Sequence, residues 1–262
     1  MTATMDDLEQ LARVLVDAHA RRQPFTTLSV GGRRLSVDEG YAVQERLVRQ
    51  LQGGTAVTVV GYKIGLTSAV MQQMCGIATP IHGAILSSRV HAAGCVLQRS
   101  DYGRLGLEFE IAVRLSRDVA TPPASVQEMA ASIDAVCAAI ELVDDRSADY
   151  QSLDAASLVA DNSWNAGVVL GRWMSPPDDL AGRAGRVSVD GVPGDAGRVG
   201  DALDHPFESV RWLATQLART GRTLRAGMII MTGSIVKTRF PSGPGAWLYE
   251  VDGMGAVAVE VR

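Results

Sequence analysis

The stretch Leu107-Glu-Phe-Glu-Ile-Ala-Val-Arg-Leu115 places a large apolar side chain at every second position. A period of two is typical of a β-strand, because successive side chains of a strand point to opposite faces. Glu108 and Glu110 therefore share one face of the predicted strand, while Phe109 and Ile111 share the other. The pattern predicts a strand with one apolar face and one face that carries two neighbouring carboxylates.

Further short strands are expected on both sides of this stretch. The segment Thr55–Ile64 is rich in β-branched residues, and Ala138–Val143 is apolar except for one glutamate. Closing strands are expected at residues 228–232, 246–251 and 256–261. The glycine-rich segment 190–200 is expected to form a hairpin loop.

Helices are expected in the first fifty residues. Leucines recur there at helical spacing, and Ser36 with Glu39 forms a capping box for a second helix that ends at Gly53-Gly54. Shorter helices are expected at residues 68–74, 125–137 and 207–219. We therefore expect an α+β protein with two parts, a helical N-terminal cap (residues 1–54) and a mainly β body (residues 55–262).

The composition excludes several functional classes. The 262 residues are 47% hydrophobic and 21% charged, which is the composition of a folded protein with a core. A net charge of -4, with scattered Lys and Arg, excludes the basic surface of a nucleic-acid-binding protein. No apolar stretch is long enough to span a membrane, and the acidic N-terminus lacks the apolar core of a signal peptide. The three cysteines have no close partner in the sequence, so we expect a cytoplasmic protein.

Glu108 and Glu110 are the first candidates for chemistry. Two carboxylates on one strand face repel each other unless they face water or share a divalent cation, and the solvated face is the commoner case. Glu141 changes this balance because it stands inside the apolar run Ala138–Val143, where an acid needs a partner. Three carboxylates suit Mg²⁺ or Mn²⁺ better than Zn²⁺. We therefore predict that these three glutamates bind one Mg²⁺ or Mn²⁺ ion.

Three other segments offer binding groups. Lys63 lies between two glycines, where it could hold a substrate carboxylate or polarise a carbonyl, but it could equally be a strand-end lysine that reaches solvent. The polar run 159–165 is either a binding segment or an ordinary turn. The run 231–234 offers hydroxyls and backbone N–H groups to an anion.

Commoner sites are excluded by their spacing. Four residues that might suggest zinc do not follow any structural-zinc pattern: Cys75, His82, His91 and Cys95. The glycine-rich motifs of serine hydrolases, P-loop NTPases and dinucleotide-binding proteins are also missing from the sequence.

The order of these motifs resembles the family of 2-keto-4-pentenoate hydratases and 4-oxalocrotonate decarboxylases, within the fumarylacetoacetate-hydrolase-like superfamily. The matching pieces cover nearly the whole chain: Gly61-Tyr-Lys-Ile-Gly-Leu-Thr-Ser68, Met71-Gln72, Leu107-Glu-Phe-Glu-Ile111, Ile140-Glu-Leu-Val143, Val159-Ala-Asp-Asn162, His205-Pro206, Ile230-Met-Thr-Gly233 and Gly253-Met-Gly-Ala-Val257. The resemblance implies a mixed β-roll body with a helical N-terminal cap, a cytoplasmic homo-oligomer, and a small 2-oxo or 2-hydroxy acid as substrate.

The resemblance also implies roles for individual residues. The family's metal ligands correspond to Glu108, Glu110 and Glu141, and its lysine corresponds to Lys63. Its Asp-Asn and Thr-Gly elements correspond to four further residues, of which the first is a predicted catalytic residue and the others are predicted substrate contacts: Asp161, Asn162, Thr232 and Gly233.

One segment departs from the hydratase pattern. Hydratases of this family carry Pro-Asp-[Tyr/Phe]-Gly, whose Asp is placed to move protons, whereas Thr79-Pro-Ile-His-Gly83 has Ile81 at that position and resembles the decarboxylase branch. If water addition is the reaction, His82 is the nearest titratable residue in sequence to replace the Asp. Positions 81 and 82 of a strand face opposite ways, however, so His82 reaches the pocket only if Pro80 breaks the alternation.

The run Asn162-Ser163-Trp164-Asn165 is also altered relative to the hydratases, and Ile81, Ser163 and Trp164 are predicted substrate contacts. We predict a lyase of the hydratase type, which adds water to a 2-hydroxy-2,4-dienoate or a 2-oxo-3-enoate in the degradation of aromatic compounds. A decarboxylase of 2-oxo-3-hexenedioate is the alternative that the Thr79–Gly83 segment favours. A non-catalytic ligand-binding relative is a third, although three clustered glutamates and Lys63 argue against it.

Overall fold

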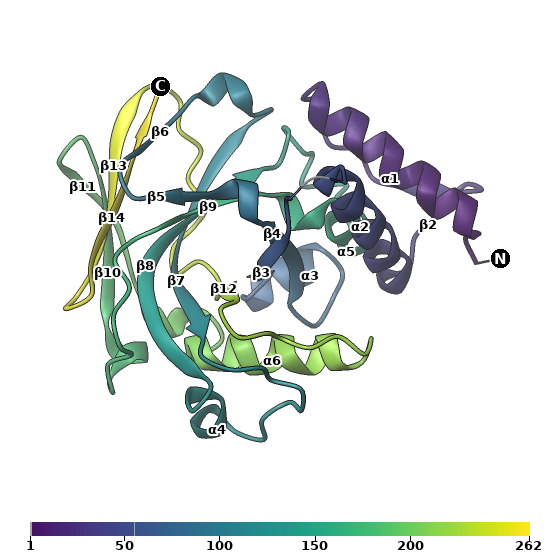
Figure 1. The fold of residues 1–262 in the computed structure, drawn as a ribbon. Coiled ribbons are helices and arrows are strands. Elements are labelled where there is room, and N and C mark those ends of the chain that lie inside the picture. Colours follow the sequence, from purple (N-terminus) through teal and green to yellow (C-terminus); the bar gives the residue numbers. More distant parts are fainter. Residues whose placement is uncertain (1, 55) are drawn as a thin grey trace.

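Two β-sheets form the body of the protein in the computed structural model, which describes residues 2–54 and 56–262 (Figure 1). The larger sheet has seven strands in the order β4-β3-β12-β7-β8-β9-β5, and the smaller has five in the order β11-β10-β13-β14-β6. The larger sheet contains β3 (Val59–Gly65), β4 (Ile81–Leu86), β5 (Val90–Ala92), β7 (Leu105–Leu115), β8 (Ile133–Asp144), β9 (Asn165–Leu170) and β12 (Ile229–Met231). The smaller contains β6 (Cys95–Leu97), β10 (Ala184–Val189), β11 (Val192–Arg198), β13 (Gly245–Val251) and β14 (Gly255–Val261).

The alternation in β7 separates the core from the acidic face, as predicted. Phe109 and Ile111 are fully buried in the main apolar cluster, which also contains residues of the smaller sheet. The rings of Phe109 and Tyr249, on β7 and β13, have centroids 5.6 Å apart. The two sheets therefore pack face to face through the apolar side of β7, and the opposite side of β7 is left for polar groups.

The pairing of β7 with β8 decides where the third glutamate lies. These two long strands run antiparallel, and their register puts Glu108 directly opposite Glu141. Figure 1 shows them as long curved strands through the middle of the body. Residues opposite each other in an antiparallel pair lie about 5 Å apart at Cα, so this register brings the two side chains together.

The N-terminal helices pack on the body through a short helix that follows β8. Helices α1 (Met5–Ala20) and α2 (Val37–Gln52) share an apolar cluster with α5 (Ala155–Ala160). Gly40 on α2 allows the close approach, because a Cβ there would lie 2.5 Å from the carbonyl oxygen of Ala156. A small hairpin, β1 (Ser29–Val30) with β2 (Arg33–Arg34), joins α1 to α2. The helical cap is present, but its division from the body at residue 54 remains a prediction, since α5 belongs to both packing units.

Two predicted elements have other bounds than expected. Ser125 caps the start of the helix expected at residues 125–137, but α4 (Val126–Ala130) ends at Ala130 and β8 begins at Ile133, because residues 133–137 pair with β7. The expected hairpin at 190–200 is present, but its loop is shorter than expected, since residues 192–198 form β11 and pair with β10. Residue 55, where the first body strand was expected to begin, lies outside the described residues, and β3 begins at Val59.

The other predicted helices and strands are confirmed with small changes at their ends. Helix α3 spans Ala69–Met74, and α6 spans Pro206–Ala218, where His205 accepts a hydrogen bond from the backbone N–H of Phe207. Among the described residues, none of the helices has the length and apolar character that crossing a membrane requires. The expected α+β class, with mixed sheets and a helical front, is confirmed.

Candidate active site

Three glutamates meet where β7 and β8 pair, and we call them the acidic cluster: Glu108, Glu110 and Glu141. One carboxylate oxygen from each lies within 4.8 Å of the others. Glu110 and Glu141 are fully buried, and Glu108 is half-buried. Carboxylates held this close in the interior repel one another unless they bind protons or a cation.

Protein hydrogen-bond donors reach only some of the carboxylate oxygens of the acidic cluster. The backbone N–H of Gly233 donates to Glu110 Oε2 (2.8 Å), and Asn165 Nδ2 donates to Glu141 Oε1 (3.0 Å). The hydroxyl of Thr238 donates to Glu108 Oε1 (2.6 Å). Within the described residues, Glu110 Oε1 and Glu141 Oε2 are buried without a hydrogen-bond partner. Buried carboxylate oxygens that lack donors fit a hard divalent cation such as Mg²⁺ or Mn²⁺.

Burial makes Glu110 and Glu141 reluctant to ionise. Burial is the main cause that raises the pKa of Glu110 well above its ordinary value, and the charges of Glu141 and Glu108 raise it further. Burial also raises the pKa of Glu141 to about 7, although the positive charge of Lys63 opposes the shift. A divalent cation would replace these protons and favour the ionised form of both groups.

Lys63 is the nearest positive charge to the acidic cluster. Its Nζ lies 3.1 Å from Glu141 Oε1, and its side chain is only 5% exposed. Burial lowers its pKa, but attraction to Glu141, Glu108 and Glu110 outweighs burial, so the pKa of Lys63 is raised. Lys63 is therefore a buried, protonated partner of the cluster and not a strand-end lysine that reaches solvent.

We expect the metal-free protein to lose stability as the pH rises from about 5 to about 8. The folded-state pKa of Glu141, about 7, lies above its ordinary value of 4.5, so the folded protein keeps this proton longer than the unfolded chain does. The stability that protonation gives is present at low pH and is lost as the pH rises through the folded-state pKa. Thermal unfolding at a series of pH values measures it. Glu141→Gln cannot ionise and should flatten the dependence, and an equally steep fall in this variant would contradict the assignment.

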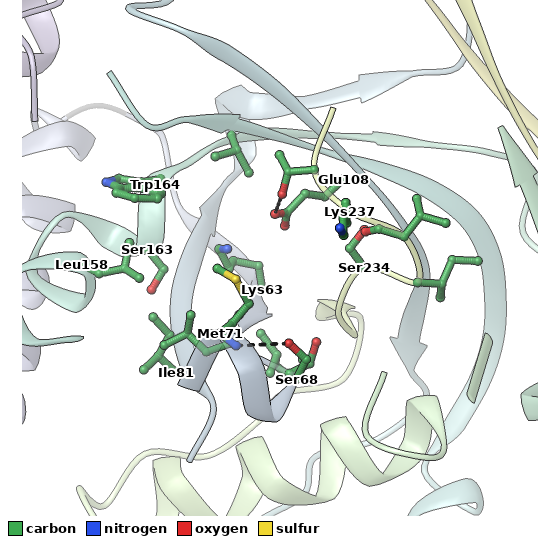
Figure 2. Close-up of a pocket in the computed structure, with 18 of the residues that line it drawn as sticks. Lys63, Ser68, Met71, Ile81, Glu108, Leu158, Ser163, Trp164, Ser234 and Lys237 are labelled. Carbon is green, nitrogen blue, oxygen red and sulfur yellow. Dashed lines mark hydrogen bonds between the residues drawn. The ribbon is translucent and has the colours of Figure 1, made fainter. Parts of the chain in front are cut away.

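Glu108 of the acidic cluster lines a cavity of about 560 Å³, whereas Glu110 and Glu141 are not among its lining residues (Figure 2). One side, the charged end, is polar and consists of Lys63, Glu108, Ser234, Lys237 and Thr238. The other side, the apolar wall, belongs to a single buried apolar cluster and consists of Leu66, Ile81, Val143, Leu153, Leu158 and Trp164. The cavity therefore matches a ligand with an anionic or chelating head and an apolar or conjugated tail.

The predicted substrate contacts divide into two groups. Ile81, Ser163 and Trp164 line the cavity, as predicted. Asn162 and Thr232 do not line it, because their side chains bind the backbone instead. Asn162 bonds to both N–H and C=O of Ala84 (2.7 and 2.9 Å), and the hydroxyl of Thr232 donates to the carbonyl of Ile111 (2.9 Å).

The remaining predicted residues act at a distance from the cavity. Gly233 contributes its N–H to Glu110 and is not a lining residue. Asp161 is fully buried, lies within hydrogen-bond distance of His19 (2.7 Å) and is ion-paired with Arg146 (2.8 Å); it does not line the cavity, and its catalytic role stays a prediction. These contacts fix the backbone that leads into Ser163 and Trp164.

His82 does not line the cavity, because strand alternation continues past Pro80. Its ring stacks on Tyr41 with centroids 4.5 Å apart and is 2% exposed, while Ile81 faces the cavity. Burial lowers the pKa of His82 to about 3, so the ring is neutral near pH 7. The structure therefore places His82 outside the cavity lining, and its role as a proton carrier stays a prediction that this position does not favour.

Two charged residues of the cavity lining, Asp201 and Lys237, were not predicted from the sequence, and Lys237 lies at the charged end. Lys237 lies on the segment between Ser234 and Thr238, which follows β12 and lines the charged end. A signal for it exists, since Lys63 and Lys237 are the only two lysines of the chain. Nothing in the local sequence around Lys237 points to the acidic cluster, which lies more than ninety positions earlier in the chain.

Comparisons with known proteins agree with this geometry. Residues 78–262 match the family of the fumarylacetoacetate (FAA) hydrolase C-terminal domain. The chain is 30% identical over 259 residues to 2-keto-4-pentenoate hydratase of Paraburkholderia xenovorans (strain LB400), an alignment that covers 98% of this chain and 96% of the relative. It is 30% identical over 199 residues to 4-oxalocrotonate decarboxylase of Pseudomonas putida, covering 75% of each chain.

A solved structure covers the whole fold. The 4-oxalocrotonate decarboxylase from Pseudomonas putida G7, complexed with magnesium and adipate, superposes with a TM-score of 0.93 at 26% identity. The superposition covers 100% of this chain and 99% of that one. The resemblance inferred from the motifs is thus confirmed.

Proposed function

Because the chain belongs to the fumarylacetoacetate hydrolase family, we propose that it is a divalent-metal-dependent lyase of the hydratase type. Its substrate is a 2-hydroxy-2,4-dienoate or the related 2-oxo-3-enoate. One observation carries the proposal: Glu110 and Glu141 bury carboxylate oxygens without donors next to Lys63 and Glu108, which line the charged end of a cavity with an apolar wall. The same family includes a 4-oxalocrotonate decarboxylase complexed with magnesium, which supports a divalent cation as cofactor, with Mg²⁺ or Mn²⁺ the ions we propose.

The acidic cluster and Lys63 prepare the charged end for the substrate head. Glu108, Glu110 and Glu141 would hold the cation, which supplies a Lewis acid for the 2-oxygen and the carboxylate of the substrate. Lys63 keeps its proton beside Glu141 and adds a fixed positive charge where negative charge develops on the 2-oxygen. Both charges are in place before the reaction, so they need no reorganisation during it.

The apolar wall holds the conjugated part of the substrate. Ile81, Leu158 and Trp164 are buried side chains that pack against the tail and keep bulk water away from it. In the reaction the dienol gains a proton at C5 and loses its hydroxyl proton, and water then adds oxygen at C4 and hydrogen at C3. Because Ile81 has no titratable group and His82 lies outside the cavity lining, we assign the transfer to groups of the charged end or to water in the cavity.

Decarboxylation is the second candidate, and Ile81 is the observation that favours it. A residue without a titratable group lies where hydratases carry an acid, and its neighbours in the wall are apolar. An apolar setting destabilises a distal carboxylate and favours its loss as CO₂. The wall alone therefore suits both reactions, and the breadth of sequence similarity to 2-keto-4-pentenoate hydratase favours water addition.

Product analysis separates the two candidates. We expect the Mg²⁺- or Mn²⁺-loaded protein to convert 2-hydroxypenta-2,4-dienoate to 4-hydroxy-2-oxopentanoate, measured by loss of dienoate absorbance and by mass spectrometry of the product. The parallel assay uses 2-oxo-3-hexenedioate and measures CO₂. Release of CO₂ from the diacid without hydration of the dienoate would replace the hydratase by the decarboxylase. The homo-oligomeric assembly and cytoplasmic location implied by the family are part of the proposal, and light scattering on the purified protein measures the former.

A further inference from the structure

The basic residues of the chain are distributed unevenly around the cavity. Only two of the 25 Lys and Arg residues are lysines, Lys63 and Lys237, and both line the cavity. None of the arginines of the described chain lines it. A lysine is a compact, flexible point charge, whereas an arginine forms rigid, bidentate contacts, so lysine suits an anion that must enter and leave.

The two lysines differ in what they already bind. Lys63 is buried and paired with Glu141. Lys237 is exposed, and no carboxylate among the described residues forms an ion pair with it. Its neighbours hold it near the acidic cluster, because Gly233 donates to Glu110 and Thr238 donates to Glu108. Figure 2 shows Lys237 beside Ser234 on the same side of the cavity as Glu108, across from Trp164 and Leu158.

Once a cation is bound at the acidic cluster, Lys237 is the positive charge of the charged end that remains for the substrate carboxylate. The three negative charges of the acidic cluster are offset by the single positive charge of Lys63 and the double charge of a divalent cation. The loaded cluster is then neutral and offers no net attraction to a further anion. The carboxylate of a 2-oxo acid adds one negative charge, and Lys237 is the remaining positive charge that lines the cavity.

We propose that Lys237 is the counter-ion that binds the C1 carboxylate of the 2-oxo acid substrate at the mouth of the charged end. The inference rests on the proposed function, since it takes the metal-loaded cluster and a 2-oxo acid as given. It divides the work of the two lysines: Lys63 acts on charge that develops at the 2-oxygen, and Lys237 selects for an acidic substrate. Lys237 is thus a specificity-determining residue.

Asp201 is the carboxylate of the cavity lining outside the acidic cluster that competes with the substrate for Lys237. It is an exposed carboxylate whose Oδ2 accepts the backbone N–H of Arg198 (2.7 Å). This hydrogen bond keeps Asp201 at the turn that it caps. A substrate carboxylate that also meets the metal site has an additional partner, so it displaces water from Lys237 more readily than Asp201 does.

The test compares an acid with its neutral analogue. Calorimetry on the Mg²⁺-loaded protein measures the affinity for 2-oxobutanoate and for 2-oxobutanamide, which keeps both oxygens of the head but has no charge. In Lys237→Met we expect binding of the acid to weaken about tenfold, the lower end of a charge-assisted contact, while binding of the amide stays unchanged. Lys237→Arg should restore most of the loss. Mg²⁺ affinity, titrated separately, should be the same in all three proteins.

Arg13→Met is the matched control, since it removes an equal charge from an exposed position on α1 outside the cavity. Arg13→Met should leave the affinity for both the acid and the amide unchanged. Unchanged acid affinity in Lys237→Met, or an equal loss for acid and amide, overturns the role of Lys237 and leaves the proposed function standing. Failure of the Mg²⁺-loaded wild-type protein to bind either ligand overturns both. In steady-state assays the loss in Lys237→Met should appear in KM, with kcat nearly unchanged.

Discussion

Glu110→Gln is expected to lower kcat/KM by about three orders of magnitude, which corresponds to the several kcal/mol that a Lewis-acid cation contributes. The substitution keeps the shape of the side chain and the acceptor for the Gly233 N–H, but it removes the charge of a fully buried ligand. Mg²⁺ affinity should fall in parallel, measured by calorimetry. The metal-free variant should unfold at a higher temperature than the wild type near pH 8, because one of three repelling carboxylates is gone.

Glu250→Gln provides the control for this variant. Glu250 is an exposed glutamate on β13, outside the acidic cluster, and its loss should change neither metal affinity nor kcat/KM. Together the two variants separate a local effect of the cluster from a general effect of lost acidic charge. Retained Mg²⁺ affinity in Glu110→Gln would exclude Glu110 from the metal site.

Lys63→Met is expected to lower kcat/KM roughly ten- to a hundredfold at saturating metal, since one charge-assisted contact is lost. The loss should appear mainly in kcat, because the charge of Lys63 acts on the negative charge that develops at the 2-oxygen. Metal affinity should be retained or increased, since Lys63 and a cation repel each other at the same cluster.

The acid limb of the pH profile gives a second measurement on Lys63→Met. Lys63 lowers the pKa of Glu141, so its removal should move the acid limb of kcat/KM to higher pH. Lys63→Arg keeps the charge and should keep the limb near its wild-type position. A Lys63→Met protein with wild-type kcat and an unmoved acid limb would show that Lys63 has no part in the reaction.

The acidic cluster was predictable from the sequence because each of its members stands out in the local pattern of apolar and polar residues. Glu108 and Glu110 share a strand face by period, and Glu141 is an acid inside an apolar run. Their meeting was inferred from the need for a partner, and the observed register of β7 on β8 supplies the physical reason. Register depends on long-range pairing, which the residues of one strand do not encode by themselves.

The sequence-based predictions differ from the structure where a local sequence signal does not determine a long-range contact. Ser125 caps the first turn of α4, but a cap does not determine the length of a helix, and the pairing of residues 133–137 with β7 ends the helix early. Asp161 lies in a family motif, but its carboxylate contacts His19 and Arg146, which come from distant segments of the chain and not from the cavity. Lys237 was missed for the same reason, since its position beside the acidic cluster depends on the path of the chain after β12.

Titration of the metal-free wild-type protein with Mg²⁺ by calorimetry, at about pH 6 and about pH 8 and in two buffers of different ionisation enthalpy, shows whether the three glutamates bind a cation. We expect one ion per chain, tighter binding at the higher pH, and release of protons at the lower pH, because Glu110 and Glu141 must ionise to bind the cation. Absence of binding, or binding with the same affinity at both pH values and without proton release, would exclude a metal site at these glutamates.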